Sequence, residues 1–305
     1  MHQAEPAPLA PKPPAHAQAP RHAGSNAAWR RLRDEATAPY RAAGRFAWHF
    51  ARGKLGRDPV FRGMLERGDL QGQRVVDIGC GQGLLLSLLQ RCMQWQQQGQ
   101  WPADWPPVPA ITAYTGIELM ARDVQRADAA VGALVLGAAG GAATSAANSA
   151  EAITDASAGA ITDAMTDASA DAIPDAMTDA RPQFICGDMC STPLPACDLV
   201  VILDVLHYVD LGAQDEVLRR VHAALQPRGR LLLRVGDRAS AGGFRVSQWV
   251  DIAVTWVRGH RAPPTWGRSV AQWTAALQAL GFHVHAVPMS AGTPFANVLL
   301  VADLP

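Results

Sequence analysis

Short apolar segments alternate with amphipathic ones from residue 74 onward, and each change of period marks a change of element. Apolar runs typical of strands cover residues 74–78, 111–119, 183–186, 198–203 and 229–235. Helical periodicity covers residues 83–94, 120–128 and 210–225. The run at 198–203 is almost wholly aliphatic, as in a strand that is buried on both faces. Strands that alternate with helices predict an α/β fold, a doubly wound parallel sheet with helices on both faces.

Two further strands are predicted at the end of the chain, at residues 282–288 and 296–302. Only a short turn joins them, so they should be antiparallel, because a parallel pair needs a crossover of about a dozen residues. The sequence thus predicts seven strands, with the last one antiparallel. If the sixth strand runs parallel to the first five, the turn at 289–295 lies at their carboxyl ends.

The N-terminal part divides into a tail and two helices. Residues 1–38 are rich in proline and alanine, and we expect them to be disordered because such a segment cannot bury a core. Two helices are predicted over residues 39–69, and Asp58 and Gly68 should cap the second of them. Phe46 and Phe50 share one face of the first helix, which should point inward. Its outward face carries Arg41, Arg45 and Arg52.

An alanine-rich insertion interrupts the main domain at residues 131–180. It contains no lysine or arginine, and the tetrad Ile-Thr-Asp-Ala recurs within it in several variants. These tetrads are too short for a solenoid unit, which needs about 20 residues. We therefore expect a segment without chemistry, around which the core at residues 70–305 folds.

Composition narrows the class of protein. The 305 residues carry no formal net charge, which argues against a dedicated nucleic-acid-binding protein, since such proteins need a basic excess. No stretch reads as a transmembrane helix, and the N-terminus never reaches the apolar region of a signal peptide. The five cysteines are an odd count. We expect reduced thiols and a cytoplasmic protein.

The strongest chemical signal is the segment Val75-Val76-Asp77-Ile78-Gly79-Cys80-Gly81-Gln82-Gly83. An apolar strand enters a glycine-rich turn and a helix begins at once, so the backbone can approach a ligand closely. The spacing is G-x-G-x-G, not the G-x-G-x-x-G of dinucleotide-binding enzymes. Asp77 just before the turn suits a cationic ligand better than a pyrophosphate.

In this segment the chain resembles the class I S-adenosylmethionine-dependent methyltransferases, which have a Rossmann-like fold. Further matches to the family follow in order at 114–119, 186–189, 198–208 and 225–233. The resemblance implies that Glu118 binds the ribose hydroxyls, that Asp188 accepts from the adenine amino group and that Met189 packs on the ring. The full cofactor set that it implies is Asp77, Gly79, Cys80, Gly81, Gly83, Glu118, Leu119, Asp188, Met189 and Asp204.

Methyl transfer from a sulfonium needs alignment of both partners and, for a protonated acceptor, a base. His207 is the first candidate for that base, because its ordinary pKa suits proton abstraction at neutral pH, and Tyr208 is the second. The alternative is that His207 packs against the cofactor or caps the next helix. Family members that methylate amide or base nitrogens often carry Asn/Asp-Pro-Pro-Tyr after the fourth strand. This chain has Asp204-Val205-Leu206-His207-Tyr208, which favours a small-molecule or lipid-like acceptor.

The chain is also similar to proteobacterial members of the family, some of them associated with aryl polyene or lipid synthesis, in the stretches 45–55 and 292–298. The resemblance implies that the helices at 39–69 act as a lid, and their basic face would allow peripheral contact with a membrane. The alternative is an ordinary surface helix that does not act as a lid. Candidate acceptor-facing residues lie beyond the fifth strand, at 236–256, Trp266 and 289–295.

Three further questions are decided or left open by the sequence. His283 and His285, like Cys186 and Cys190, lack the spacing of a metal site, so no metal is expected. A non-catalytic binding protein of the same fold is the first alternative function, and an NAD(P)-dependent oxidoreductase is the second. The oligomeric state stays open.

Overall fold

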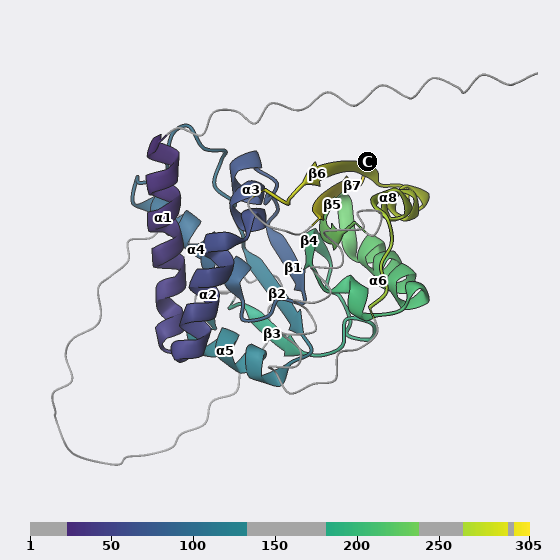
Figure 1. Cartoon of the computed structure of the whole chain (residues 1–305), viewed down its shortest axis with the longest axis horizontal. Helices are drawn as coiled ribbons and strands as arrows, with labels where there is room; N and C mark the ends of the chain where they lie inside the picture. The colour runs from purple at the N-terminus through teal and green to yellow at the C-terminus, as the bar shows by residue number, and fades with distance from the viewer. Residues whose placement is uncertain (1–22, 133–180, 238–264, 292–295) are drawn as a thin grey trace, which may run out of the picture.

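The computed structural model describes residues 23–132, 181–237, 265–291 and 296–305, and these form one seven-stranded sheet with helices on both faces (Figure 1). The strand order is β3-β2-β1-β4-β5-β7-β6. Strands β1 to β5 are parallel, and β7 is antiparallel to both of its neighbours. The predicted fold class and the antiparallel last strand are therefore confirmed. The strands are β1 Arg74–Ile78, β2 Ala113–Glu118, β3 Gln183–Cys186, β4 Cys197–Leu203, β5 Leu225–Gly236, β6 His283–Pro288 and β7 Asn297–Asp303.

The helices bury two separate cores, one on each face of the sheet. Strand β4 shows why, since Leu199 and Val201 belong to one core while Val200 and Ile202 belong to the other. The N-terminal helices, α4 and α5 lie on one side of the sheet, and α6 and α8 lie on the other (Figure 1). The helices are α1 Ala23–Thr37, η1 Ala38–Arg41, α2 Arg45–Arg57, α3 Pro59–Arg67, α4 Leu84–Gln97, α5 Ala121–Val131, η2 Leu206–Tyr208, α6 Leu211–Ala224 and α8 Val270–Ala279.

The expectation of a disordered tail through residue 38 is wrong from residue 23 onward. Trp29, Leu32 and Ala36 form an apolar stripe on α1, and all three are buried against the rest of the core. Two polar contacts fix α1 on α4: Ser87 Oγ donates to the Ala36 carbonyl at 2.6 Å, and Trp95 Nε1 donates to Glu35 at 2.7 Å. Residues 1–22 lie outside the described residues.

The helix α2 begins at Arg45 and turns a different face inward from the one that we predicted. Ala47, Ala51 and Leu55 are its buried residues, and small side chains allow the helix to pack closely. Phe46 is 52% exposed, so the expectation that it faces inward is wrong, and Phe50 is half-buried. The caps of α3 are confirmed, because Asp58 accepts from the Val60 amide and Gly68 is left-handed.

The insertion begins later than its composition indicated. Val131 is the last residue of α5 and is buried in the core, so residues 131 and 132 belong to the folded domain and not to the insertion. Residues 133–180 lie outside the described residues. Within the described part of the chain, no helix is long and apolar enough to cross a membrane.

Candidate cofactor and acceptor site

The predicted site residues come together at the carboxyl edge of the sheet, where β1 to β4 end side by side. Ile78 pairs with Ile117 and with Ile202, and Glu118 pairs with Cys186. The segments that follow these residues therefore share one edge. The strand order reverses between β1 and β4, which is where open α/β sheets bind their ligands.

The glycine-rich turn is shaped by its neighbours as well as by its own sequence. Gly79, Gly81 and Gly83 all have positive φ, at 75°, 56° and 73°. A Cβ on Gly79 would lie 2.5 Å from Val205 Cγ1, so the turn after β4 rests directly on this glycine. A Cβ on Gly81 would meet no atom within 4 Å. The backbone at Gly81 is thus open to close approach by a ligand.

Asp77 lies beneath this turn and is only 4% exposed. Its Oδ2 accepts a hydrogen bond of 2.6 Å from the Tyr114 hydroxyl. Burial raises the pKa of Asp77 to about 7; the Tyr114 bond opposes this rise and the nearby Glu118 charge adds to it. A cationic ligand beside Asp77 would favour its ionised form.

Glu118 ends β2 with its carboxylate on the glycine turn. It accepts from the Gly81 amide at 3.0 Å and from the Met120 amide at 2.9 Å. A carboxylate can accept about four hydrogen bonds, so these contacts are compatible with binding two hydroxyls. The next residue, Leu119, is 67% exposed and stands at the same edge.

Asp188 and Met189 follow β3 beside Glu118. The Gly187 amide donates to the Glu118 carbonyl at 3.0 Å, which joins the two strand ends. Asp188 is exposed, and its Oδ1 accepts from the Cys190 amide at 2.9 Å. Met189 is half-buried against the core on the α6 face. The arrangement leaves Asp188 more accessible than Met189.

The Cys80 side chain is packed inside the protein, between the glycine-rich turn and β2. It is buried, and its Sγ would lie 2.8 Å from a Cβ on Gly116, so it packs closely on β2. Burial raises the pKa of the Cys80 thiol well above its ordinary value, and the charges of Asp77 and Glu118 act in the same direction. The thiol is therefore neutral at physiological pH and is not a nucleophile.

His207 and Tyr208 belong to η2, which begins directly after Val205, the residue that contacts Gly79. Their rings lie 4.1 Å apart at 46°. The Trp266 amide donates to the His207 carbonyl at 2.8 Å, and the buried Gln214 donates to the carbonyls of Leu206, Val209 and Trp266. Trp266 is 43% exposed beside His207. The structure thus joins the backbone of an exposed tryptophan to the segment that carries the first candidate base.

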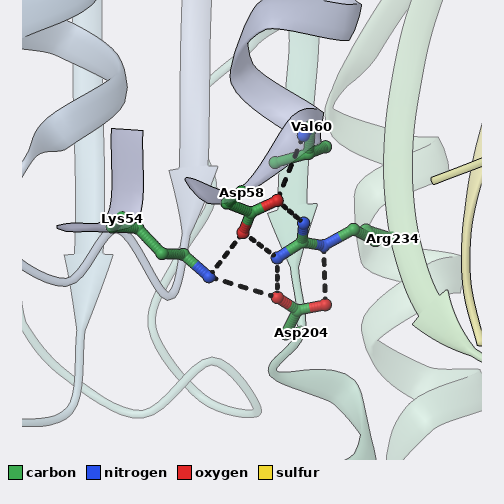
Figure 2. A network of polar contacts seen from close by, with 5 residues as sticks. All are labelled: Lys54, Asp58, Val60, Asp204 and Arg234. Carbon is green, nitrogen blue, oxygen red and sulfur yellow. Dashed lines mark hydrogen bonds and ion pairs between the residues drawn. The ribbon is translucent and has the colours of Figure 1, made fainter. Parts of the chain in front are cut away.

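Asp204 is bound by cations of this chain, a role that the sequence did not indicate. Both of its carboxylate oxygens accept from Arg234 of β5, which also donates twice to Asp58 (Figure 2). Lys54 lies 2.8 Å from Asp58 and 3.6 Å from Asp204. The signal for Arg234 was a charged residue inside the apolar run Leu231-Leu232-Leu233-Arg234-Val235, since a buried charge needs a partner.

The remaining predictions concern the turn after β6, the acceptor-facing residues and metal ligands. Strand β6 is parallel to β5, so the turn after it lies at the carboxyl edge, and Met289 there is buried against Gly63 of α3. Of the acceptor-facing candidates, residues 238–264 and 292–295 lie outside the described residues. No cluster of three or more His, Cys, Asp or Glu in the described ranges could hold a metal ion.

A family model described as a methyltransferase domain matches residues 47–287. The match spans well over half of the chain, so the chain belongs to the methyltransferase domain family. The resemblance that the motifs indicated is confirmed at this level, and the Rossmann-like fold agrees with it. The narrower proteobacterial and lipid-type subclass stays a prediction.

The individual proteins that this chain resembles either match a smaller share of it than the family model does or have a low sequence identity to it. Acetylserotonin O-methyltransferase of Mus musculus is 35% identical over 102 residues, which are 33% of this chain and 25% of that protein. The chain thus matches a quarter of the length of this curated relative. Human N-acetylserotonin methyltransferase in complex with S-adenosylmethionine has 18% identity and a TM-score of 0.48, over 89% of this chain and 59% of that one. Magnesium protoporphyrin IX methyltransferase of Synechocystis PCC 6803 with S-adenosylhomocysteine has 15% identity and a TM-score of 0.46, over 90% and 99%.

Proposed function

We propose that the protein is an S-adenosylmethionine-dependent methyltransferase that acts on a small-molecule acceptor. The observation that carries the proposal is the glycine turn with Asp77 beneath it and Glu118 against it, in a chain of the methyltransferase family. A nicotinamide oxidoreductase is disfavoured by the same family match and by the G-x-G-x-G spacing.

The donor set fits the cofactor. Gly81 offers an open backbone, Glu118 offers a carboxylate for the ribose hydroxyls, and the exposed Asp188 offers an acceptor for the adenine amino group. The exposed Leu119 would be covered by the bound nucleoside. When bound, S-adenosylmethionine supplies an electrophilic methyl group.

The residues of this chain would orient the acceptor and remove its proton. His207 is the proposed base, because it lies in η2, within the turn after β4 that rests on Gly79. Trp266 would hold an aromatic or apolar acceptor beside it, with about 1 kcal/mol for a stacked ring. Tyr208 packs on His207 and would limit its orientations.

The N-terminal helices are proposed to cover the cofactor. Tyr40 of η1 is buried and donates to the Gln82 carbonyl at 2.8 Å, so this segment contacts the glycine turn itself. Tyr40→Phe removes that bond and keeps the ring. We expect S-adenosylhomocysteine affinity to fall several-fold, as a lost hydrogen bond of about 1 kcal/mol would cause. Unchanged affinity would contradict the proposal that these helices cover the cofactor. Ser25→Ala is the control, because the Ser25 hydroxyl of α1 bonds Glu66 and does not reach the glycine turn.

A lipid-like acceptor is a narrower proposal that rests on the surface of α2. Phe46 is half exposed with Arg126 at 4.6 Å over its ring, and Arg41 and Arg45 are exposed nearby in sequence. A basic face with an exposed aromatic ring suits an anionic lipid surface. Co-sedimentation with phosphatidylserine vesicles should fall for Phe46→Ser. Equal sedimentation of both proteins, or none for the wild type, would exclude this contact.

Calorimetric titration with S-adenosylmethionine, S-adenosylhomocysteine and NADH tests the main proposal. We expect both adenosyl ligands to bind and NADH not to bind. Binding of NADH alone would overturn the assignment. Incubation with methyl-labelled S-adenosylmethionine and a panel of aromatic and acyl acceptors then separates an enzyme from a non-catalytic binding protein: label transfer that Asp77→Asn abolishes identifies an enzyme.

A further inference from the structure

Arg234 is the centre of a charge network between two parts of the chain that are distant in sequence. It is only 2% exposed and lies between Asp58, 176 positions earlier, and Asp204, 30 positions earlier (Figure 2). Each carboxylate accepts two hydrogen bonds from its guanidinium. A planar guanidinium with two bidentate partners fixes their relative orientation as well as their distance.

The network is electrically balanced and joins four elements. Lys54 at the end of α2 reaches both carboxylates, Asp58 caps α3, Asp204 follows β4, and Arg234 belongs to β5. Burial alone would raise the pKa values of Asp58 and Asp204, but the two cations hold both below the ordinary value. Two carboxylates and two cations give no net charge at neutral pH.

Asp204 needs this support because its backbone is strained. It has a φ of 61°, which is uncommon for a residue other than glycine and costs on the order of 1 kcal/mol. Its amide donates to the Arg234 carbonyl at 3.3 Å, and its carboxylate accepts from the Arg234 side chain. Backbone and side chain of Arg234 together therefore determine the conformation at Asp204.

The position of Asp204 connects the network to the site. Val205, the next residue, is the one that rests on Gly79, and His207 follows two residues later. The amides of Tyr208 and Val209 donate back to the carbonyls of Val205 and Leu206, which closes the turn. A change in orientation at Asp204 would thus move the contact with the glycine turn and the proposed base together.

We propose that Lys54, Asp58 and Arg234 are positioning residues, which hold the turn 204–209 against the glycine turn and connect its conformation to the N-terminal helices. That these residues position a catalytic base rests on the proposed methyl transfer. That they couple the N-terminal helices to the turn does not depend on it, so each of these two claims can be tested and rejected separately.

Asp58→Asn is the most informative variant, because asparagine is as good an N-cap as aspartate and the change removes mainly the charge. Hydrogen–deuterium exchange should become about tenfold faster at the amides of residues 204–209, although the substitution is in a different element. Exchange in β1 and β2 should stay unchanged. Lys54→Met should have the same effect to a smaller degree, and Lys54→Arg should restore slow exchange.

Asp34→Asn is the matched control. Asp34 pairs with Arg52 of α2 at 3.2 Å, but this pair joins α1 to α2 and does not reach the sheet. Its loss should leave exchange at 204–209 as in the wild type. Faster exchange confined to residues 45–67 in the Asp58→Asn and Lys54→Met proteins would overturn the proposal, and so would an equal effect of Asp34→Asn.

Affinity for S-adenosylhomocysteine separates this proposal from the proposed function. A fall of about threefold or more in the affinity of Asp58→Asn for S-adenosylhomocysteine supports the proposal that the network positions the glycine turn. Lys54→Met should lower this affinity as well, and Lys54→Arg should restore it. If the wild-type protein does not bind S-adenosylhomocysteine, the proposed function fails, while exchange at 204–209 still decides whether the network holds the turn. Should Asp58→Asn not fold, Lys54→Met decides the question, because that ammonium is partly exposed and its loss is better tolerated.

Discussion

Asp77 and Asp204 invite comparison, since both belong to aliphatic segments at neighbouring strands of the sheet and yet their pKa values are shifted in opposite directions. Asp77 in β1 has a neutral hydroxyl as its close partner, and burial raises its pKa to about 7. The Asp204 side chain after β4 is partly buried, with 31% of its surface exposed, and Arg234 and Lys54 hold its pKa below the ordinary value. Burial opposes ionisation at both positions, and only a nearby cation reverses it.

The difference indicates two uses of a carboxylate within one site. Asp204 is bound by cations of its own chain, so its ion pairs hold the turn 204–209 in place. Asp77 lies beneath the glycine turn with the neutral Tyr114 hydroxyl as its close partner, so a cationic ligand would complete its surroundings. The following experiments disturb one side of this comparison at a time.

Arg234→Met should have the largest effect, because it leaves Asp58 and Asp204 without their shared guanidinium. Removal of one partner of a buried ion pair costs about 3–5 kcal/mol of unfolding free energy. Chemical denaturation measures the change. Arg230→Met on the same strand is the control, since Arg230 pairs with Asp303 at a partly exposed position and should cost less than about 1 kcal/mol. Similar losses for the two variants would contradict the central role of Arg234.

Glu118→Ala should weaken S-adenosylmethionine binding by at least about 100-fold while the fold stays intact. Two charge-assisted bonds to the ribose hydroxyls would each contribute about 1.5–3 kcal/mol. Calorimetry measures the affinity and circular dichroism checks the fold. Glu216→Ala, an exposed acid of α6, should bind as the wild type does. Equal affinity of Glu118→Ala and wild type would show that the second-strand assignment is wrong.

Asp77→Asn should change how stability depends on pH. The pKa of Asp77 is higher in the folded than in the unfolded chain, so the unfolded chain loses this proton first as pH rises from about 4 to 7. Stability from this group is therefore present below pH 4 and decreases up to pH 7. Asparagine removes that decrease, on the order of 2–4 kcal/mol across the window.

Urea unfolding of both proteins at pH 4.5 and pH 7.5 measures this difference. The gap in unfolding free energy between Asp77→Asn and the wild type should grow towards pH 7.5 in favour of the variant. The carboxylates with a lowered pKa, Asp58 and Asp204, act in the opposite direction and only below about pH 4, so they do not interfere in this window. A gap independent of pH would mean that Asp77 is not held protonated by its surroundings.

Replacement of residues 133–180 by a short Gly/Ser linker should have the smallest effect. The segment supplies no basic residue that could pair with either aspartate, and long loops add little closure entropy. The melting temperature and S-adenosylhomocysteine affinity should stay as in the full chain. A deletion that also removes Val131 is the matched comparison and should lower the melting temperature, because Val131 is buried. A large loss for the shorter deletion would contradict the prediction.

The parts of the fold that the sequence predicted well are those whose evidence is local. The strand, the glycines and the helix of 75–83 are contiguous, so their pattern indicated the turn directly. The helix α1 was missed because the proline-rich composition of the first 20 residues was extended over the stripe of Trp29, Leu32 and Ala36. The helix α8 was missed as well, although Ser269 and Gln272 form a capping box that is readable from the sequence.

The parts of the site that were not predicted depend on contacts between distant segments. Asp58 was identified as an N-cap, which it is, but its bond to Arg234 spans 176 positions. The apolar run around Arg234 indicated a buried charge without indicating the partner. Helical spacing predicts Phe46 on the inner face, whereas close packing of Ala47 and Ala51 leaves Phe46 exposed.

The sequence by itself determined the order of strands and helices over residues 74–236, the glycine turn and the membership in the methyltransferase family, because each of these is encoded by neighbouring residues. It placed an aspartate after an aliphatic run both at Asp77 and at Asp204 and offered no local reason to treat them differently. The tertiary structure decided that difference. It brought Arg234 and Lys54 to Asp204 and a tyrosine hydroxyl to Asp77, and the charge on a buried carboxyl group depends on the groups that surround it.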